Sequence, residues 1–527
     1  MKKFGVMALA ATLLAGTFAS APLQAEEGKP GGTLVIGTTQ KARHLNPAVQ
    51  SGIATAVPGT QIFATPLRFD ENWQAKPYLA ESWEIAEDGK SITLNLRKNA
   101  KFHDGKPITS EDVAFSLQTV KDNHPFKTMF APVTAVETPD AHTAILKFAQ
   151  PHPAAMLAMS GALLPIIPKH VYGDGQDAKS HPANSAPVGS GPFKFVEFKP
   201  GQHIILEKNP DYFLEGKPYL DKIIIKNYKD PTSLALATDK GEVTMFPFLA
   251  STRDIARLKK NKDIVVTSDG YAAVGPLNWL AFNTNNEYLK HKKVRQAIAY
   301  GFDQKFIINA LHGGLSKPAS GPVAPGSPYY APDVEKYALD LDKANALLDE
   351  AGFKAGDDGT RFTLGLDYIP GSAEMQKSIA EYLKPQLKKI GINVELRASP
   401  DFPTWAKRVG GHEFDMTMDI VFNWADPVIG VHRTYICSNI RKGVIWSNTQ
   451  SYCNEEVDKL LDTAGKELDQ AKRIALYQQA QKIIVDEAPQ VFINTLPYHT
   501  AYNATKLGNP PLTIWGAMSP LDEVYFK

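Results

Sequence analysis

The alternation of apolar and polar residues predicts a β-hairpin at residues 81–96. Ile92, Leu94 and Leu96 alternate with polar residues, so their side chains lie on one face of a strand. Asp88-Gly89 precedes this strand, and glycine tolerates the positive φ that tight hairpin turns require. We therefore expect a strand over residues 81–85 that turns back and pairs with the strand containing Leu94.

The next segment predicts a capped helix. Thr109 or Ser110 can accept a hydrogen bond from the first free backbone amides of a helix. Glu111 and Asp112 then lie in its first turn, where acidic residues suit the positive end of the helix dipole. One apolar stripe follows at i, i+4 and i+7, and it consists of Val113, Leu117 and Val120.

The two halves of the chain have different patterns. In the first half, strands are expected at 32–38, 193–198, 220–226 and 243–248, and a loop rich in glycine and proline spans 313–332. After residue 342, helices and strands alternate: helices at 342–351, 374–390, 455–464 and 471–487, and strands at 362–369, 392–396 and 414–422. Alternation of this kind implies a partly parallel sheet, so the sequence predicts an α/β fold with a second lobe.

Composition narrows the functional class. The chain has 527 residues, of which 43% are hydrophobic and 21% charged, so it can bury more than one core. The formal net charge is +1 and no block of Lys and Arg is present, which argues against a nucleic-acid binder. No nucleophile elbow, phosphate-binding loop, dinucleotide fingerprint or zinc-protease motif occurs. We expect no enzymatic activity, no cofactor and no metal site.

The N-terminus has the pattern of a signal peptide. Lys2 and Lys3 precede a short apolar run that ends near Phe18, and cleavage after Ala25 would release the mature chain. Pro22 disfavours the alternative site after Ala21. No cysteine lies near the cleavage site for lipid attachment. We therefore expect an exported protein without a lipid anchor. Such a receptor would diffuse away from the cell unless an outer membrane retained it, so we expect it in a periplasm.

Two cysteines occur, Cys437 and Cys453. Two thiolates cannot fill a tetrahedral zinc site, and in an exported protein a disulfide is the default state. Two buried free thiols are the alternative.

Several segments resemble one protein family. Residues 88–116 read DGKSITLNLRKNAKFHDGKPITSEDVAFS, which closely resembles the signature of extracellular solute-binding proteins family 5, the peptide, opine and nickel-complex receptors of ABC importers. Residues 189–193, 209–213 and 294–300 are also similar to segments of that family. The resemblance implies a two-lobed binding protein with an extra subdomain in the first lobe. It also implies two crossover strands, at 277–284 and 491–496, that form a hinge below a ligand cleft.

The resemblance and the strand pattern together give domain boundaries. The signal peptide is expected at 1–25 and the first lobe at 26–283, with an inserted subdomain around 66–190. The second lobe is expected at 284–496, and residues 497–527 return to the first lobe.

Most candidate ligand-binding residues come from two segments, and Trp279 and Trp405 are added from outside them. Residues 423–448 combine aromatic, charged and amide side chains at the end of a predicted strand, a mixture that suits a cleft for a partly apolar, charged ligand. An ordinary packed loop with one ion pair is the alternative. The loop after the first strand is the other segment, where ligand contact and simple solvation are equally open. The candidates are Thr38, Thr39, Arg43, Asn46, Trp279, Trp405, Asn423, Trp424, Asp426, Arg433 and Tyr435.

One position departs from the family pattern. Peptide receptors of this family often read A-D-Y-x-(D/E)-P, where the first Asp pairs with the peptide ammonium, and that position here is Asn423. The charge-assisted bond is therefore lost. Arg433 remains available for a carboxylate or phosphate. For Asp426, followed by Pro427, a turn-forming role ranks ahead of ligand contact.

The predicted function is a monomeric periplasmic receptor that binds short peptides or opine-type conjugates and delivers them to an inner-membrane ABC permease. A receptor for a nickel complex or haem is the first alternative. A secreted two-lobed hydrolase and a structural or chaperone protein are the others. Related sequences read Ser where this chain has Cys437 and Cys453, and this paired change supports a disulfide that stiffens the candidate ligand loop.

Overall fold

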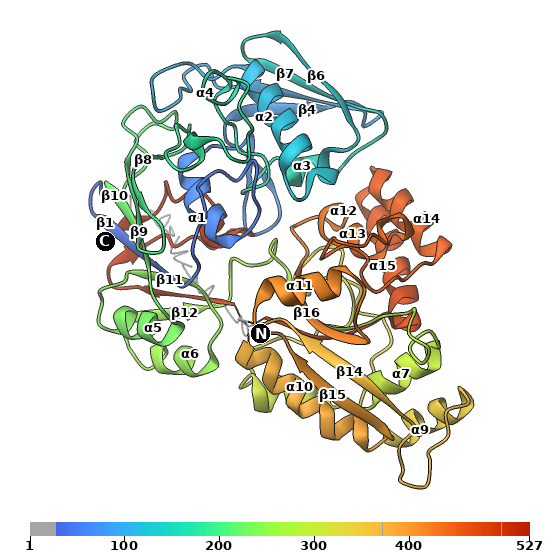
Figure 1. Cartoon of the computed structure of the whole chain (residues 1–527). Coiled ribbons are helices and arrows are strands. Elements are labelled where there is room, and N and C mark those ends of the chain that lie inside the picture. The colour runs from blue at the N-terminus through green and yellow to red at the C-terminus, as the bar shows by residue number, and fades with distance from the viewer. Residues whose placement is uncertain (1–27, 371–372, 497) are drawn as a thin grey trace, which may run out of the picture.

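The computed structural model describes residues 28–370, 373–496 and 498–527. The predicted signal peptide, residues 1–25, lies outside the described residues. Within these ranges, none of the helices has the length and apolar character needed to cross a membrane. Three larger sheets organise the chain: one of four strands at the top of Figure 1, one of seven at the left, and one of five at the lower right.

The four-stranded sheet contains the predicted hairpin. Strands β4 (Ala80–Ile85) and β5 (Ser91–Leu96) pair antiparallel, and the sheet has the order β4-β5-β7-β6, with β6 at Val133–Asp140 and β7 at Thr143–Phe148. The side chains of Ile92, Leu94 and Leu96 are buried, as their spacing predicts. Helix α2 (Ser110–Asn123) begins after Thr109, whose backbone amide donates to Asp112 Oδ2 at 2.9 Å. The hairpin and the capped helix are both confirmed.

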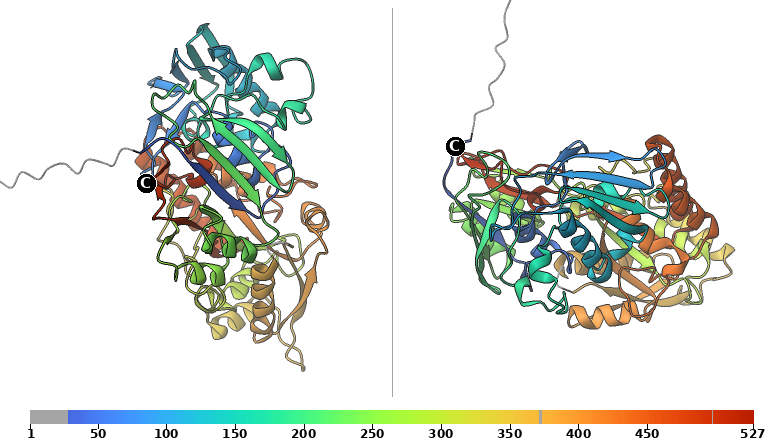
Figure 2. Two further views of the ribbon diagram at one scale, coloured as in Figure 1. Left: turned by 90° about the vertical axis from the view of Figure 1, so that its left-hand side faces the viewer. Right: turned by 90° about the horizontal axis from the view of Figure 1, so that it is seen from above.

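The seven-stranded sheet has the order β12-β18-β11-β1-β10-β9-β8. Its strands are β1 (Thr33–Thr38), β8 (Phe193–Lys199), β9 (His203–Lys208), β10 (Lys222–Asn227), β11 (Met245–Leu249), β12 (Ile264–Thr267) and β18 (His499–Asn503). Strand β1 runs parallel to β10 and β11, so distant parts of the chain lie side by side, as Figure 2 shows for the blue strand and its green neighbours. Helices α1 (Ile53–Ile62), α5 (Pro231–Asp239) and α6 (Thr252–Leu258) belong to the same part of the molecule.

The five-stranded sheet has the order β15-β14-β16-β13-β17. Its strands are β13 (Pro276–Phe282), β14 (Phe362–Tyr368), β15 (Ile392–Ala398), β16 (Met416–Phe422) and β17 (Gln490–Thr495). Strand β14 pairs parallel with both β15 and β16, so the predicted partly parallel sheet is confirmed. Its helices are α7 (Lys292–Tyr300), α9 (Leu341–Glu350), α10 (Ala373–Lys388), α11 (Phe402–Gly410), α14 (Glu455–Lys466) and α15 (Gln470–Glu487).

Shorter elements join these parts. They are β2 (Leu67–Phe69), β3 (Ala75–Pro77), β19 (Leu507–Gly508), β20 (Tyr525–Phe526), α3 (Ala155–Ala158), α4 (Lys169–Tyr172), α8 (Gln304–Phe306), α12 (Pro427–Gly430), α13 (His432–Tyr435), η1 (Lys127–Phe130), η2 (Pro182–Asn184), η3 (Ile307–Leu311), η4 (Cys437–Asn439) and η5 (Gly516–Met518).

Two neighbouring strands connect the lobes. Strand β13 follows β12 of the seven-stranded sheet, and β17 precedes β18 of the same sheet, so the chain crosses between the lobes at both places. Strands β13 and β17 pair antiparallel, with Leu280 opposite Val491 and Asn278 opposite Asn494. The predicted pair of crossover strands is therefore confirmed, and a pair of this kind can act as a hinge.

The lobes also touch each other at the segment that follows β16. Trp424, which follows β16 of the second lobe, packs into the core of the first lobe, and its ring lies 5.3 Å from that of Phe126 between centroids. The backbone amide of Ala425 donates to the carbonyl of Ala273 at 2.6 Å. The segment after β16 is thus a point of contact between the lobes.

Candidate functional site

A buried ion pair anchors the segment that follows β16. Asp426 accepts two hydrogen bonds from Arg473 of α15, with Nη1–Oδ2 and Nη2–Oδ1 both 2.9 Å. Its Oδ1 also accepts from the amide of Val428 at 2.9 Å, which caps α12. Burial alone would lower the pKa of Arg473, but the Asp426 carboxylate more than offsets this and the pKa lies above its usual value. The predicted turn-forming role of Asp426 is present, and its carboxylate is engaged within the protein.

Asn423 ties the same segment to the glycine- and proline-rich loop. Its Oδ1 accepts from the amide of Ala324 at 2.6 Å, and its Nδ2 donates to the carbonyl of Pro322 at 3.0 Å. Asn423 is buried, so both ends of its amide are satisfied inside the fold. A contact of this side chain with ligand stays a prediction.

Arg433 of α13 lies where the lobes meet. Its Nη2 donates to the carbonyl of Phe422 at 3.1 Å and its Nε to that of Gly430 at 3.3 Å. The guanidinium lies 5.0 Å from the ring centre of Phe126 of the first lobe, which is cation–π range. Within the described residues no carboxylate comes within 4.0 Å of it. Burial lowers the pKa of Arg433 to about 10, although the charge of Asp419 acts in the opposite direction.

Asp419 of β16 is a second charged group here, and it is not among the residues predicted from the sequence. Its Oδ1 accepts from the amide of Ile420 at 2.6 Å and from Trp446 Nε1 at 3.2 Å. Only 5% of the residue is exposed, and across the described chain no cation forms an ion pair with it. Burial raises the pKa of Asp419 to about 7, although both hydrogen bonds and the charge of Arg433 act to lower it. A lone Asp within the apolar strand MTMDIVF is the one sequence signal that could have identified it.

Aromatic side chains from both lobes surround the contact. We call them the interlobe aromatic cluster: Phe126, Phe248, Tyr271, Phe422, Trp424 and Tyr498. Phe248 of β11 lies 5.5 Å from Tyr498, and Phe422 of β16 lies 6.4 Å from the same ring, measured between centroids. Rings of this kind can stack on apolar parts of a ligand. Of the six, only Trp424 was predicted as a site residue.

The first-lobe candidates have different surroundings. Thr38 lines a cavity of about 20 Å³ together with Phe248. Thr39 is half-buried and Arg43 is exposed. Asn46 is fully buried, where its Nδ2 donates to Asn184 Oδ1 at 2.8 Å and its Oδ1 accepts from the amide of Ala48 at 2.9 Å. Asn46 therefore fixes the loop from within, and ligand contacts of all four stay predictions.

Three further candidates are packed in the second lobe. Trp279 lies 6.1 Å from Phe492 between ring centroids in a buried cluster. Trp405 is fully buried and its Nε1 lies 3.3 Å from Thr417 Oγ1, while the hydroxyl of Tyr435 donates to Gln490 Oε1 at 2.7 Å. These contacts give all three a place in the fold, and the structure does not bring them to the interlobe aromatic cluster.

A larger cavity of about 1010 Å³ lies beside the crossover strands. Its wall includes the strand ends Pro276 and Thr495, together with Tyr271 and Tyr498 of the interlobe aromatic cluster. None of the predicted ligand residues lines it. Because segments of both lobes form its wall, hinge motion would change its shape.

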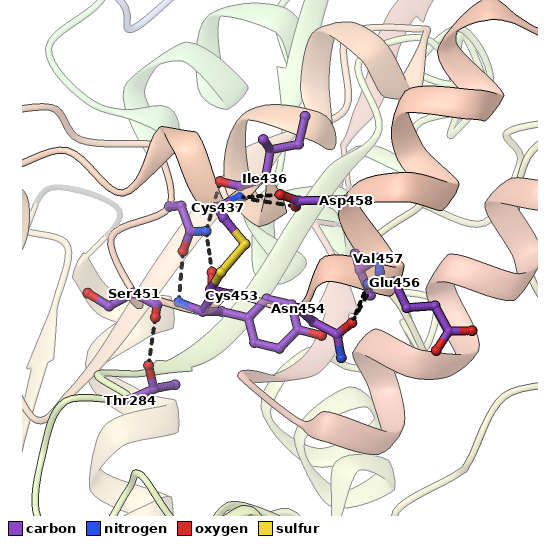
Figure 3. Close-up of a disulfide and its surroundings, with 11 residues drawn as sticks. Thr284, Ile436, Cys437, Ser451, Cys453, Asn454, Glu456, Val457 and Asp458 are labelled. Atoms are coloured by element: carbon purple, nitrogen blue, oxygen red, sulfur yellow. Dashed lines mark hydrogen bonds between the residues drawn. A yellow bond between two sulfur atoms is a disulfide. The ribbon is translucent and has the colours of Figure 1, made fainter.

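The predicted disulfide is present and closes the loop after α13. Cys437 and Cys453 are bonded, with 4.7 Å between their Cα atoms. Figure 3 shows the loop held at both ends, because Asp458 accepts from the amide of Cys437 at 3.1 Å and Thr284 Oγ1 donates to the carbonyl of Ser451 at 3.0 Å. Trp446, whose Nε1 donates to Asp419 Oδ1, lies within the loop that this disulfide closes.

The sequence comparison decides the family. Residues 74–442 match the profile of the bacterial extracellular solute-binding proteins, family 5. The chain belongs to this family. The oligopeptide-binding protein AppA of Bacillus subtilis is a relative, 29% identical over 488 residues, which cover 88% of this chain and 87% of AppA. Heme-binding protein A of Haemophilus influenzae is 30% identical, over 87% of this family 5 chain and 86% of the relative.

Solved structures agree with this assignment. The binding protein AgaA from A. tumefaciens R10, solved in complex with agropinic acid, superposes with a TM-score of 0.79 at 26% identity, and the match covers 94% of this chain and 99% of AgaA. The fold is that of the two-lobed periplasmic binding proteins, as predicted. Within the described residues, no group of three or more His, Cys, Asp or Glu side chains is arranged to hold a metal ion.

Proposed function

We propose that this family 5 protein is a periplasmic receptor that captures short peptides or opine-type solutes between its lobes. It would then deliver them to the permease of an ABC importer. The relatives named above are all binding proteins, and the chain has none of the common catalytic motifs, so we propose a receptor without enzymatic activity.

The observation that carries this proposal is Arg433 at the contact between the lobes. Its guanidinium has no carboxylate partner in the described chain, and Nη1 makes no hydrogen bond there. Arg433 is half-buried, and a cation withdrawn from water in this way is costly to leave without an opposite charge. A ligand carboxylate can supply that charge through a charge-assisted hydrogen bond, while the interlobe aromatic cluster contacts apolar ligand parts.

Export and lobe boundaries form part of the proposal. A signal peptide at 1–25 and the absence of a cysteine near its cleavage site support an unlipidated periplasmic protein. We propose lobes at 26–283, with a subdomain around 66–190, and at 284–496, with residues 497–527 returning to the first lobe. The even charge balance supports a protein that binds no nucleic acid, and we propose that it acts as a monomer.

A haem receptor is the second candidate, because one relative is named a heme-binding protein. The aromatic rings between the lobes would suit a flat, apolar ligand, whereas the charges of Arg433 and Asp419 favour a small charged one. Ligand size and charge therefore separate the two candidates.

Native mass spectrometry of protein purified from a periplasm tests the proposal, followed by calorimetric titration of the ligand-free protein. The probes are free L-dipeptides, L-tetrapeptides, N-(1-carboxyethyl) amino acids and haem. We expect micromolar or tighter binding of at least one peptide or carboxyethyl amino acid. Binding of haem alone would favour the second candidate, and turnover of a peptide ester would replace the receptor by a hydrolase.

A further inference from the structure

The charges between the second-lobe strand β16 and helix α13 are not balanced by direct ion pairs. Residues 416–435 contain two acids, Asp419 and Asp426. Asp426 is neutralised by Arg473, as described above. Asp419 has no such cation, and Arg433 has no such carboxylate, in the part of the chain that the structure describes. One acid and one guanidinium therefore remain for other partners.

Both groups keep a free polar atom that is not sealed in the core. Asp419 uses Oδ1 for its two hydrogen bonds, and its Oδ2 has no partner in the described chain. Arg433 uses Nε and Nη2, and its Nη1 has none. Neither Oδ2 nor Nη1 is among the fully buried polar atoms that lack a partner, so each reaches space that solvent can enter. An acceptor and a donor of opposite charge are thus both open to a ligand.

The two groups lie close together along the fold. Arg433 bonds to the carbonyl of Phe422, which is three residues after Asp419 on β16. A strand rises about 3.3 Å per residue, so roughly 10 Å of strand separates the two backbone positions, and two side chains can shorten this gap. The charge of Arg433 also acts on the titration of Asp419. A ligand that meets both groups must therefore carry its own opposite charges a short distance apart.

Neighbouring residues hold Asp419 in place. Trp446 Nε1 donates to it from the loop that the disulfide closes, so the carboxylate is oriented before a ligand arrives. Asn423 cannot replace it, because its amide is neutral and bonded to Ala324 and Pro322. Preorganised acceptors of this kind reduce the ordering cost of binding.

We propose that Asp419 and Arg433 form a subsite for a compact zwitterion, in which Asp419 Oδ2 accepts from the ligand ammonium and Arg433 Nη1 donates to its carboxylate. The ligand class is a free α-amino-acid end group or a dipeptide, rather than a long peptide whose terminal charges lie far apart. This inference rests on the proposed function. It names Asp419 as the residue that binds the ligand ammonium, because this chain has Asn423 at the position where peptide receptors of the family often have an Asp.

Calorimetric titration of matched ligands tests the subsite. The probes are a panel of free L-dipeptides, their N-acetyl forms, which lack the cation, and L-tetrapeptides. The proteins are the wild type and the isosteric variant Asp419→Asn. In the wild type, N-acetylation should weaken binding at least about tenfold, as expected for loss of a charge-assisted bond. In Asp419→Asn, the free dipeptide should weaken by a similar factor, and N-acetylation should then have little further effect.

Two controls make the result specific. Asp367→Asn changes another buried acid, on the neighbouring strand β14, that already pairs with Arg408, so this variant should keep the full effect of N-acetylation. If Asp419→Asn does not fold, Trp446→Phe removes only the indole hydrogen bond to Asp419. It should weaken the free dipeptide more than the N-acetyl form.

The outcomes separate this inference from the proposed function. If N-acetylation weakens binding to Asp419→Asn as much as to the wild type, the ammonium binds elsewhere and the subsite is overturned. The same result in Trp446→Phe has this meaning if only that variant folds. Binding of tetrapeptides but no dipeptide by the wild type would overturn the compact-zwitterion subsite and leave the peptide receptor intact. If no peptide and no carboxyethyl amino acid binds, the proposed function itself is wrong and the subsite falls with it.

Discussion

Asp426 and Arg473 form a bidentate ion pair in which neither side chain is exposed by more than 2%. Arg473 also donates to the carbonyl of Ala464 at 2.9 Å, so one guanidinium joins the loop after β16, helix α14 and helix α15. Because Arg433 lies seven residues after Asp426, this pair positions the part of the chain that presents it.

The ion pair leads to a stability prediction. Asp426→Asn or Arg473→Met alone should lower the free energy of unfolding by about 3–5 kcal/mol, because each variant leaves the charge of the other residue buried and unpaired. The double variant should lose less than the sum of the two, since it removes both charges together. Urea unfolding at neutral pH measures all three. Additive losses would mean that the two side chains act independently.

Arg433 gives a binding prediction. Arg433→Gln should weaken binding of a carboxylate ligand at least about tenfold, because a charge-assisted contact is lost. The melting temperature of the ligand-free protein should change little, since this half-buried cation has no carboxylate partner in the described chain. Arg257→Gln, an exposed arginine of α6 that pairs with Asp239, is the matched control and should leave binding unchanged. Unchanged affinity in Arg433→Gln would make the residue purely structural.

Local signals explain which elements could be predicted from the sequence. The hairpin turn at Asp88-Gly89, the capped start of α2 and the helix–strand alternation after residue 342 each depend on neighbours in the chain. Helix α1 gave no such signal, because nearly all of its positions are buried and Pro58 lies within it. A helix that is apolar on all sides has no periodic stripe to detect.

The candidate site was predicted only where a motif existed. Trp424 and Arg433 lie in a segment that resembles the family, whereas Asp419 lies in an otherwise apolar strand where its chemistry is visible only once its neighbours are known. Tyr271 and Tyr498 are 227 positions apart and meet because the crossover strands pair. Contacts of this kind come from tertiary structure, which the spacing of residues does not encode.

Asp419 also gives a pH prediction. Its pKa is about 7 in the folded protein and 3.8 in an exposed carboxyl, so between these values the folded state holds a proton that the unfolded state has lost. The raised pKa of Asp419 therefore makes the free energy of unfolding fall as pH rises from about 4 to about 7. The lowered pKa of His432, about 4, acts in the opposite direction between about 4 and 6.5, so wild type alone is not informative.

Comparison with Asp419→Asn isolates the contribution of the Asp419 carboxyl to the pH dependence of stability. From pH 5 to pH 8, the variant should gain roughly 2.5 kcal/mol of unfolding free energy relative to the wild type, because it has no carboxyl to ionise. Urea unfolding of both proteins at the two pH values measures the difference. A pH-independent difference would show that the Asp419 carboxyl ionises as readily as an exposed one.

The disulfide gives the last prediction. Cys437 and Cys453 are separated by 16 residues, and closing a loop of about this size should stabilise the folded state by roughly 3 kcal/mol through the unfolded chain. The double variant Cys437→Ser/Cys453→Ser should lose about this amount in urea unfolding. Mass spectrometry of non-reduced peptides should find the two cysteines linked in protein expressed in a periplasm, and two alkylatable thiols would contradict the bond.

The same variant should also lose affinity, because the bonded loop carries Trp446 and follows directly after Arg433 and Tyr435. In the wild type this loop is ordered before binding, so the ligand does not have to order it. We expect the double variant to bind a free dipeptide several-fold more weakly. Thr284→Val, which removes only the side-chain contacts of Thr284 Oγ1 with the carbonyls of Gln450 and Ser451, should show a smaller loss in the same direction. If the double variant loses stability but keeps its affinity, the loop does not need the disulfide to hold Trp446 against Asp419.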